Sequence, residues 1–152
     1  MIDALPSVLV VCSAGGHLRE ALAAIGNSIP SFDLATFKVQ HIKEIPSARR
    51  CFNLMDPHVS FWKYLVNAVQ SGFLLLRLRP QVIITTGAGI ALCCAVFGKW
   101  MGAKLIVLDT VACSDELSRT GRLLYRYADL FIVQWPELVT KYPKAIYGGC
   151  VL

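Results

Sequence analysis

The chain has 152 residues, of which 55% are hydrophobic, and this length and composition predict a single globular domain over residues 1–152. Its formal net charge of +5 favours an anionic partner, which can be nucleic acid, acidic lipid or a phosphorylated ligand. No apolar run reaches the roughly 20 residues of a membrane span, and the six cysteines lack metal-ligand spacing, so we expect free thiols in a reducing compartment.

Short β-branched runs alternate with helical patterns along the chain. The clearest strand candidates are 7–12, 81–86, 104–110 and 129–133, with weaker ones at 35–40 and 50–55. Helical patterns occupy 17–26, 59–79, 90–102, 118–128 and 136–142. Because the strands lack polar alternation, both faces of their sheet should be covered, which predicts an α/β fold with a doubly wound, mainly parallel, Rossmann-like sheet.

Two glycine-rich loops follow strand candidates, and each opens onto a helix. The first is CSAGGH at 12–17, and the second is TTGAGIA at 85–91. Glycine lets backbone N–H groups approach a ligand and a helix N-terminus favours negative charge, so we expect the loops to clasp one phosphorylated ligand. The candidate binding residues are Ser13, Ala14, Gly15, Gly16, Thr86, Gly87 and Gly89. Glycines that only turn the chain tightly are the alternative.

The residue spacing in the first glycine loop can be compared with the motifs of known phosphate-binding sites. The glycines of the first loop do not form G-x-G-x-x-G, and the P-loop pattern is absent from the sequence. A cysteine-dependent phosphatase needs C-x5-R, whereas six residues separate Cys12 from Arg19, which weakens that interpretation without removing it. A small phosphohydrolase using Cys12 and a non-catalytic nucleotide-binding module therefore stay open. Nucleic-acid binding is disfavoured, because the basic residues form no recognised motif.

His17 is the candidate acid–base residue. It opens a helix beside two glycines, where the helix dipole can hold an imidazole neutral as a general base or a donor to phosphate. Local hydrogen bonding at the helix start is the alternative. For the acidic stretch that begins at Asp109, we expect a structural or capping role, with a second base as the alternative.

Four motifs in this order resemble a known family. They are SAGGHL at 13–18, TTGAG at 85–89, TGRLLYRYADLFIVQWPEL at 120–138 and KYPKAIYGG at 141–149. Together they resemble the bacterial PssD-type exopolysaccharide glycosyltransferase subunits and the eukaryotic asparagine-linked glycosylation protein fourteen, over about residues 8–149. The resemblance implies the acceptor-binding half of a GT-B glycosyltransferase, similar to the N-terminal half of the peptidoglycan enzyme MurG, with no cofactor or metal ion.

The same resemblance implies that a partner polypeptide binds the donor while this chain binds the acceptor. The nucleotide-sugar half would be a separate PssE-type polypeptide that docks to form an active heterodimer. The two glycine loops would grip the diphosphate of a polyprenyl-diphosphate-linked sugar, and His17 would accept the proton of its attacking hydroxyl. The donor would be a nucleotide sugar, with a UDP-sugar favoured, and the product would serve exopolysaccharide, capsule or lipid-linked oligosaccharide synthesis. Residues expected at the partner interface are Trp135, Tyr147, Gly148 and Gly149.

A lipid-linked acceptor requires contact with a membrane surface. The eukaryotic relatives carry an N-terminal anchor, whereas only about seven residues precede the first predicted strand here, which favours peripheral binding at the cytoplasmic face of a bacterial inner membrane. The helix at 59–79 is the candidate surface, with a core helix as the alternative. Its proposed membrane-facing residues are Phe61, Trp62, Lys63, Phe73, Leu74, Leu75, Leu76, Arg77 and Arg79.

Overall fold

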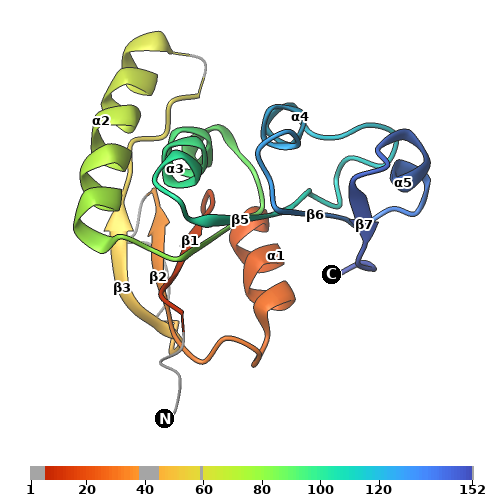
Figure 1. Ribbon diagram of the computed structural model, residues 1–152, viewed down its shortest axis with the longest axis horizontal. Coiled ribbons are helices and arrows are strands. Elements are labelled where there is room, and N and C mark those ends of the chain that lie inside the picture. Colours follow the sequence, from red (N-terminus) through yellow and green to blue (C-terminus); the bar gives the residue numbers. More distant parts are fainter. Residues whose placement is uncertain (1–5, 38–44, 59, 152) are drawn as a thin grey trace.

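The computed structural model describes residues 6–37, 45–58 and 60–151, which form a layered α/β structure (Figure 1). The strands are β1 (Val8–Val11), β2 (Phe32–Thr36), β3 (Ala48–Asn53), β4 (Val82–Thr85), β5 (Lys104–Leu108), β6 (Leu130–Val133) and β7 (Ala145–Tyr147). The helices are α1 (Gly16–Ile25), α2 (Phe61–Leu78), α3 (Gly89–Trp100), α4 (Arg119–Leu124) and α5 (Glu137–Lys141).

All seven strands belong to one sheet in the order β3-β2-β1-β4-β5-β6-β7, and every neighbouring pair is parallel. This confirms the predicted doubly wound sheet. The chain first builds outward from β1 to β3, and then α2 carries it back to β4 on the other side of β1. The strand order therefore reverses between β1 and β4, and open α/β sheets bind ligands outside the carboxyl ends of their strands at such a point.

Helices cover both faces of the sheet, which explains the apolar strands. Figure 1 shows α1 on one face and the other four helices on the opposite face. Leu9 and Val11 of β1 are buried in the layer that includes α2 and α3, whereas Val8 and Val10 are buried in the layer that includes α1. Since alternate side chains of one strand enter two different cores, the sequence shows a continuous apolar run rather than an alternation.

Two predicted elements differ from the structure, and one strand was not predicted. The strand predicted at 35–40 begins earlier, at Phe32, and its last three residues lie outside the described ranges. The helix predicted at 118–128 ends at Leu124, since turns replace its last part. β7 was not predicted, because a three-residue edge strand depends on pairing with β6 and carries little pattern of its own.

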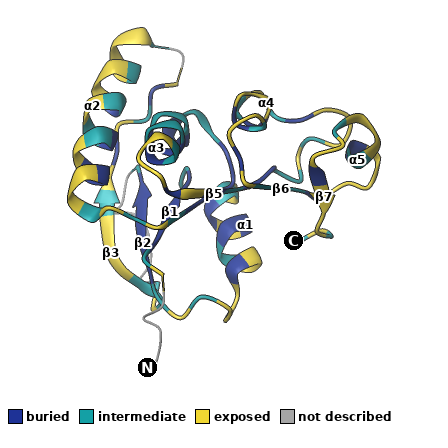
Figure 2. Ribbon diagram, viewed as in Figure 1, coloured by how far each residue is buried: buried dark blue, intermediate teal, exposed yellow. Residues whose placement is uncertain are grey.

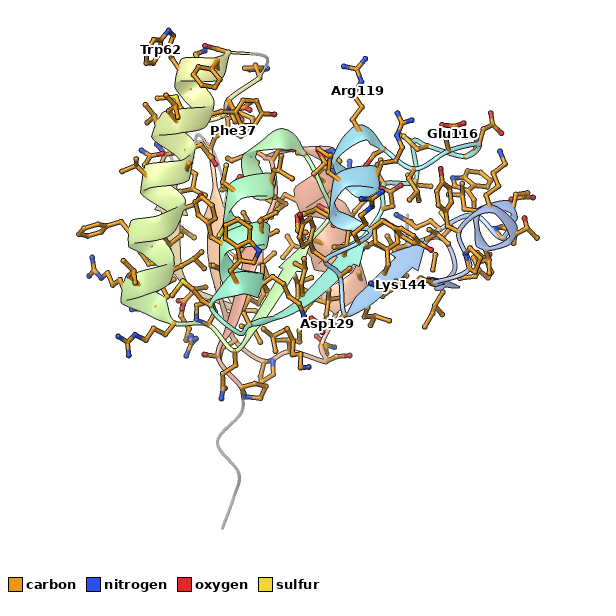
Figure 3. All side chains as sticks on the ribbon, turned by 45° about the horizontal axis from the view of Figure 1, so that its top comes forward. Phe37, Trp62, Glu116, Arg119, Asp129 and Lys144 are labelled. Atoms are coloured by element: carbon orange, nitrogen blue, oxygen red, sulfur yellow. The ribbon has the colours of Figure 1, made fainter. Side chains whose placement is uncertain are left out.

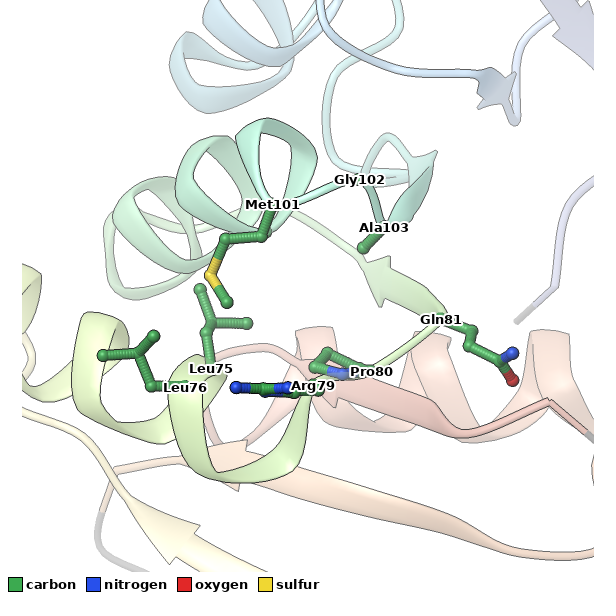
Figure 4. Close-up of a pocket in the computed structure, with 9 residues that line it drawn as sticks. Leu75, Leu76, Arg79, Pro80, Gln81, Met101, Gly102 and Ala103 are labelled. Atoms are coloured by element: carbon green, nitrogen blue, oxygen red, sulfur yellow. The ribbon is translucent and has the colours of Figure 1, made fainter.

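A cavity of about 450 Å³ lies between the C-terminal ends of α2 and α3 (Figure 4). Leu75, Arg79 and Met101 line it together with Gln81 and Ala103, which stand at the starts of β4 and β5. The cavity is thus at the amino ends of the strands. The glycine loops follow the carboxyl ends of β1 and β4, so this cavity is separate from the crevice where the fold is expected to bind ligands.

Candidate functional site

The first glycine loop connects β1 to α1 and leaves the helix N-terminus open. Gly15 has a φ of 95°, which glycine adopts without strain, and α1 starts at the next residue. No side chain among the described residues caps α1, and its first turn has no acidic residue. A methyl group on Gly15 or Gly16 would meet no described atom within 4 Å, so the space beside the loop can admit a ligand.

The second glycine loop connects β4 to α3 through an unusual backbone. The N–H of Gly87 donates to Thr85 Oγ1 at 3.0 Å, and the φ angles of Gly87 and Ala88 are 92° and 68°. A positive φ costs a residue with a side chain about 1–3 kcal/mol and is often found at binding sites. Like α1, α3 has no side-chain cap among the described residues and no acid in its first turn. In contrast, Ser118 Oγ caps α4 by accepting a backbone N–H at 2.9 Å.

A hydrogen bond joins the two loops. The Thr86 hydroxyl is fully buried and donates to the backbone carbonyl of His17 at 2.9 Å. The residues come from loops 69 positions apart in the sequence, and the parallel pairing of β1 with β4 brings them together. The structure therefore places the two uncapped helix N-termini beside each other. Thr86 and Gly87 hold the loops in place, because the Thr86 hydroxyl and the Gly87 N–H each donate a hydrogen bond within the protein.

His17 lies at the start of α1 with one ring nitrogen facing the protein interior. Its side chain is 29% exposed, and its Nδ1 atom is buried 3.7 Å from Oε2 of Glu20, one helical turn later. Glu20 is 2% exposed, and its other oxygen, Oε1, accepts the Thr110 hydroxyl at 2.9 Å and the Val111 N–H at 3.0 Å. The carboxylate thus connects α1 to the loop that follows β5. Glu20 was not predicted as a site residue, although its spacing of three residues from His17 in the sequence indicated a possible contact.

The connection between β5 and α4 lies beside α1 and the second glycine loop, since Thr110 bonds to Glu20 and Ser118 approaches Gly87. Asp109 accepts the N–H of Ser118 at 2.9 Å and its hydroxyl at 2.6 Å, which agrees with the predicted structural role of Asp109. Burial raises the pKa of the Asp109 carboxyl, and the hydrogen bonds from Ser118 offset part of that rise. Ser118 Oγ would lie 3.8 Å from a methyl group on Gly87, and Tyr64 Oη would lie 2.9 Å from one on Gly89. The approach of Tyr64 to the second loop was not predicted from the sequence.

Most of the sequence matches one known protein family. Residues 27–151 match the family described as "Oligosaccharide biosynthesis protein Alg14 like". The chain belongs to this Alg14 family. The matched residues include the second glycine loop and exclude the first, so the match itself carries no information about His17.

Relatives of this Alg14-family chain extend over almost its whole length. The Homo sapiens protein named UDP-N-acetylglucosamine transferase subunit ALG14 is 26% identical, over 96% of this chain and 83% of the human protein. The Yarrowia lipolytica protein of the same name is 33% identical, over 97% of this chain and 82% of the yeast protein. These relatives place the chain in a family of glycosyltransferase subunits.

Solved structures support the fold assignment. Acinetobacter baumannii MurG superposes with a TM-score of 0.66 at 13% identity, over 87% of this chain and 43% of MurG. The UDP-N-acetylglucosamine 2-epimerase of Rickettsia bellii gives a TM-score of 0.74 at 8% identity, over 97% of this chain and 46% of the epimerase. The Alg14-family chain thus has the fold of a GT-B half-domain and spans less than half the length of either structure.

The predicted membrane-facing helix has one strongly exposed apolar side. Figure 2 shows exposed residues along the outer side of α2, and Figure 3 shows Trp62 projecting away from the body of the molecule. No helix of the described residues is long and apolar enough to cross a membrane. The prediction was wrong for Leu74 and Leu75, which face inward and are buried against α3 and the sheet. The exposed residues of the outer side are Phe61, Trp62, Lys63, Leu65, Val66, Val69, Phe73, Leu76 and Arg77, followed by Arg79 beyond the helix.

The residues predicted at a partner interface surround the β7 edge of the sheet. Trp135 is partly exposed, and its indole N–H donates to the Val111 carbonyl at 2.7 Å. Tyr147 is exposed on β7, and Gly148 follows it, with its N–H bonded to the Val133 carbonyl at 3.0 Å. Gly149 has a φ of 82°. These residues therefore lie at one end of the sheet, on its last two strands and the segments that follow them.

Cys12 cannot act as a phosphatase nucleophile in this structure. It directly follows β1, is fully buried in the core layer beneath α1, and burial raises the pKa of its thiol to about 12. Cysteine chemistry needs an accessible thiolate, which this environment does not provide at neutral pH. The phosphohydrolase alternative is therefore wrong on geometric and electrostatic grounds.

Cysteine labelling of the native protein at pH 7.5 tests this conclusion. We expect N-ethylmaleimide to modify the exposed Cys51 rapidly and to leave Cys12 unmodified until the protein is unfolded, as read by peptide mass spectrometry. Guanidinium-unfolded protein is the control, in which both thiols should react. Labelling of native Cys12 as fast as Cys51 would restore the phosphatase interpretation.

Proposed function

We propose that this chain is the acceptor-binding, membrane-associating subunit of a two-component glycosyltransferase. The enzyme would transfer a sugar from a nucleotide sugar, with a UDP-sugar favoured, to a polyprenyl-diphosphate-linked sugar. Its product would serve lipid-linked oligosaccharide, exopolysaccharide or capsule synthesis. The observation that carries the proposal is the joining of two uncapped helix N-termini at the strand-order reversal by the bond from Thr86 to His17.

The joined loops form a site suited to a diphosphate. Each uncapped N-terminus directs backbone N–H groups and the positive end of a helix dipole toward the crevice. A diphosphate carries clustered negative charge and can contact both helix ends at once. The residues proposed to bind it are Ser13, Ala14, Gly15 and Gly16 of the first loop and Thr86, Gly87 and Gly89 of the second, with Thr86 and Gly87 fixing the backbone. The open space beside Gly15 and Gly16 leaves room for the ligand.

His17 is the proposed general base of the transfer. It starts α1 next to the proposed diphosphate site, so a hydroxyl of the first acceptor sugar can reach it. In the reaction, the imidazole takes the hydroxyl proton, the oxygen bonds to the anomeric carbon of the donor, and the nucleoside diphosphate leaves. Proton transfer of this kind contributes about 100-fold to 10,000-fold in rate.

A second polypeptide of the PssE type is proposed to supply the nucleotide-sugar site. The relatives in Homo sapiens and Yarrowia lipolytica are named as subunits, and the chain matches less than half of MurG. The β7 edge offers a docking surface, since its exposed side chains include Ile146 and Tyr147 at 56% and 50% exposure. An unpaired edge strand with apolar side chains favours association with another chain. Trp135, Gly148 and Gly149 extend the proposed interface.

The outer side of α2 is the proposed contact with the cytoplasmic face of a bacterial inner membrane. Its large apolar residues recur about every four positions from Phe61 to Leu76, which makes a continuous stripe along the helix. Lys63, Arg77 and Arg79 add positive charge near the two ends of the stripe. A helix of this kind lies in the plane of the membrane surface, with its apolar side in the lipid and its cations near anionic headgroups.

A transfer assay with lipid-linked acceptor and a panel of nucleotide sugars tests the proposed function. We expect activity only when this chain and its partner are combined, and we expect His17→Ala to reduce kcat at least about 100-fold while the heterodimer still forms. The matched control is His58→Ala, since His58 is exposed, pairs with Asp56 and has no assigned role in the reaction. Full activity of the His17→Ala heterodimer would contradict the assignment of His17 as the base. Transfer by this chain without its partner would contradict the two-component proposal.

A vesicle-binding measurement tests the membrane surface. We expect Trp62→Ser to weaken binding to vesicles that contain anionic lipid about 10-fold or more, because burial of a large apolar side chain contributes about 1.5–3 kcal/mol. Trp100→Ser is the matched control, since Trp100 is 71% exposed, close to the 75% of Trp62, and stands at the end of α3 outside the stripe. Equal losses for both variants would contradict a surface centred on α2.

A further inference from the structure

Two buried polar atoms near the glycine loops lack hydrogen-bond partners among the described residues. They are Nδ1 of His17 and Oε2 of Glu20, and they face each other at 3.7 Å. Buried polar atoms are nearly always hydrogen-bonded, so an unpaired donor and an unpaired acceptor this close indicate an interaction between them. The distance exceeds that of a hydrogen bond, but contacts in unliganded active sites are often long and tighten when substrate binds.

Glu20 is held rigidly enough to orient a neighbour. Its Oε1 atom accepts the Thr110 hydroxyl at 2.9 Å and the Val111 N–H at 3.0 Å, which fixes the carboxylate between α1 and the loop after β5. This leaves Oε2 directed at His17. Asp109 and Cys113 are near enough to interact electrostatically with Glu20, but neither provides a hydrogen bond to Oε2. A carboxylate that is 2% exposed needs such a donor, and His17 is placed to supply it.

We propose that Glu20 is the positioning residue of His17, and that its Oε2 accepts the Nδ1–H of the imidazole. This inference rests on the proposed function of His17 as the base. With the proton fixed on Nδ1, the Nε2 atom carries the lone pair that takes the proton from the acceptor hydroxyl. When His17 becomes protonated during transfer, the nearby carboxylate stabilises the imidazolium. Thr110 and Val111 hold Glu20, so the loop after β5 takes part in orienting the base.

Glu20→Gln separates this role from a structural one. The glutamine Oε1 can still accept from Thr110 and Val111, whereas its amide N–H group replaces Oε2 opposite His17. A donor at that position forces Nδ1 to accept and moves the imidazole proton to Nε2, where it blocks base catalysis. In the heterodimer we expect kcat to fall about 100-fold or more, with KM for the acceptor changed less than about threefold.

Nuclear magnetic resonance of the full chain labelled with ¹⁵N-histidine reads the tautomer directly. We expect the Nδ1–H form of His17 in the unchanged protein at pH 8 and the Nε2–H form in Glu20→Gln, with the signal assigned from a His17→Ala sample. Glu137→Gln is the matched control, because Glu137 is exposed and lies at the start of α5, outside the glycine loops and the loop after β5. It should change neither tautomer nor kcat.

The outcomes distinguish failure of this inference from failure of the proposed function. An Nε2–H tautomer in the unchanged protein, or full kcat in Glu20→Gln, overturns the role of Glu20. That first result does not depend on Glu20→Gln, so it decides the question even if Glu20→Gln does not fold. Full transfer activity of the His17→Ala heterodimer overturns instead the assignment of His17 as the base. Glu20 then has no role in the reaction through His17, whichever tautomer of His17 is observed.

Discussion

The arrangement of the site depends on the reversal of strand order between β1 and β4. Because these two strands are parallel neighbours, their following loops emerge side by side, and the Thr86 hydroxyl can reach the carbonyl of His17 at 2.9 Å. Without this contact, two glycine loops 69 residues apart would be separate turns. With it, the N-termini of α1 and α3 are held beside each other, and the loop after β5 is bonded to α1 through Glu20. Charge, space and a candidate base are thereby placed at one end of the sheet.

Most of the fold was predictable from the sequence because both faces of the sheet are covered. Continuous β-branched runs marked β1, β4, β5 and β6, and the intervening helical patterns fixed the alternation that leads to a parallel sheet. β7 escaped prediction because its three residues are stabilised by pairing with β6 rather than by a pattern of their own. The inward direction of Leu74 and Leu75 was also not predicted, because the buried side of α2 includes the polar Asn67 and Ser71 while its exposed side is largely apolar. Hydrophobicity alone therefore does not reveal which side packs.

The site was predictable in part. Glycines directly after two strands indicated the loops, and His17 stood out because it opens a helix there. The roles of Thr86 and Glu20 depend on contacts across 69 and 90 residues, which only the tertiary structure displays. The same holds for Cys12, whose spacing to Arg19 left a phosphatase open until burial of its thiol excluded it. Tyr64 of α2 reaches the second glycine loop through tertiary packing, and no local sequence pattern predicts that contact.

The proposed function requires that both glycine loops bind one diphosphate together. A titration of the ¹⁵N-labelled full chain with farnesyl diphosphate, followed by amide resonances and compared with farnesol, tests it most directly. We predict that the amides of Gly16 and His17 and those of Ala88 and Gly89 shift together with a single Kd, and that farnesol leaves them unchanged. Shifts confined to one loop, or equal shifts with farnesol, would contradict a shared diphosphate site.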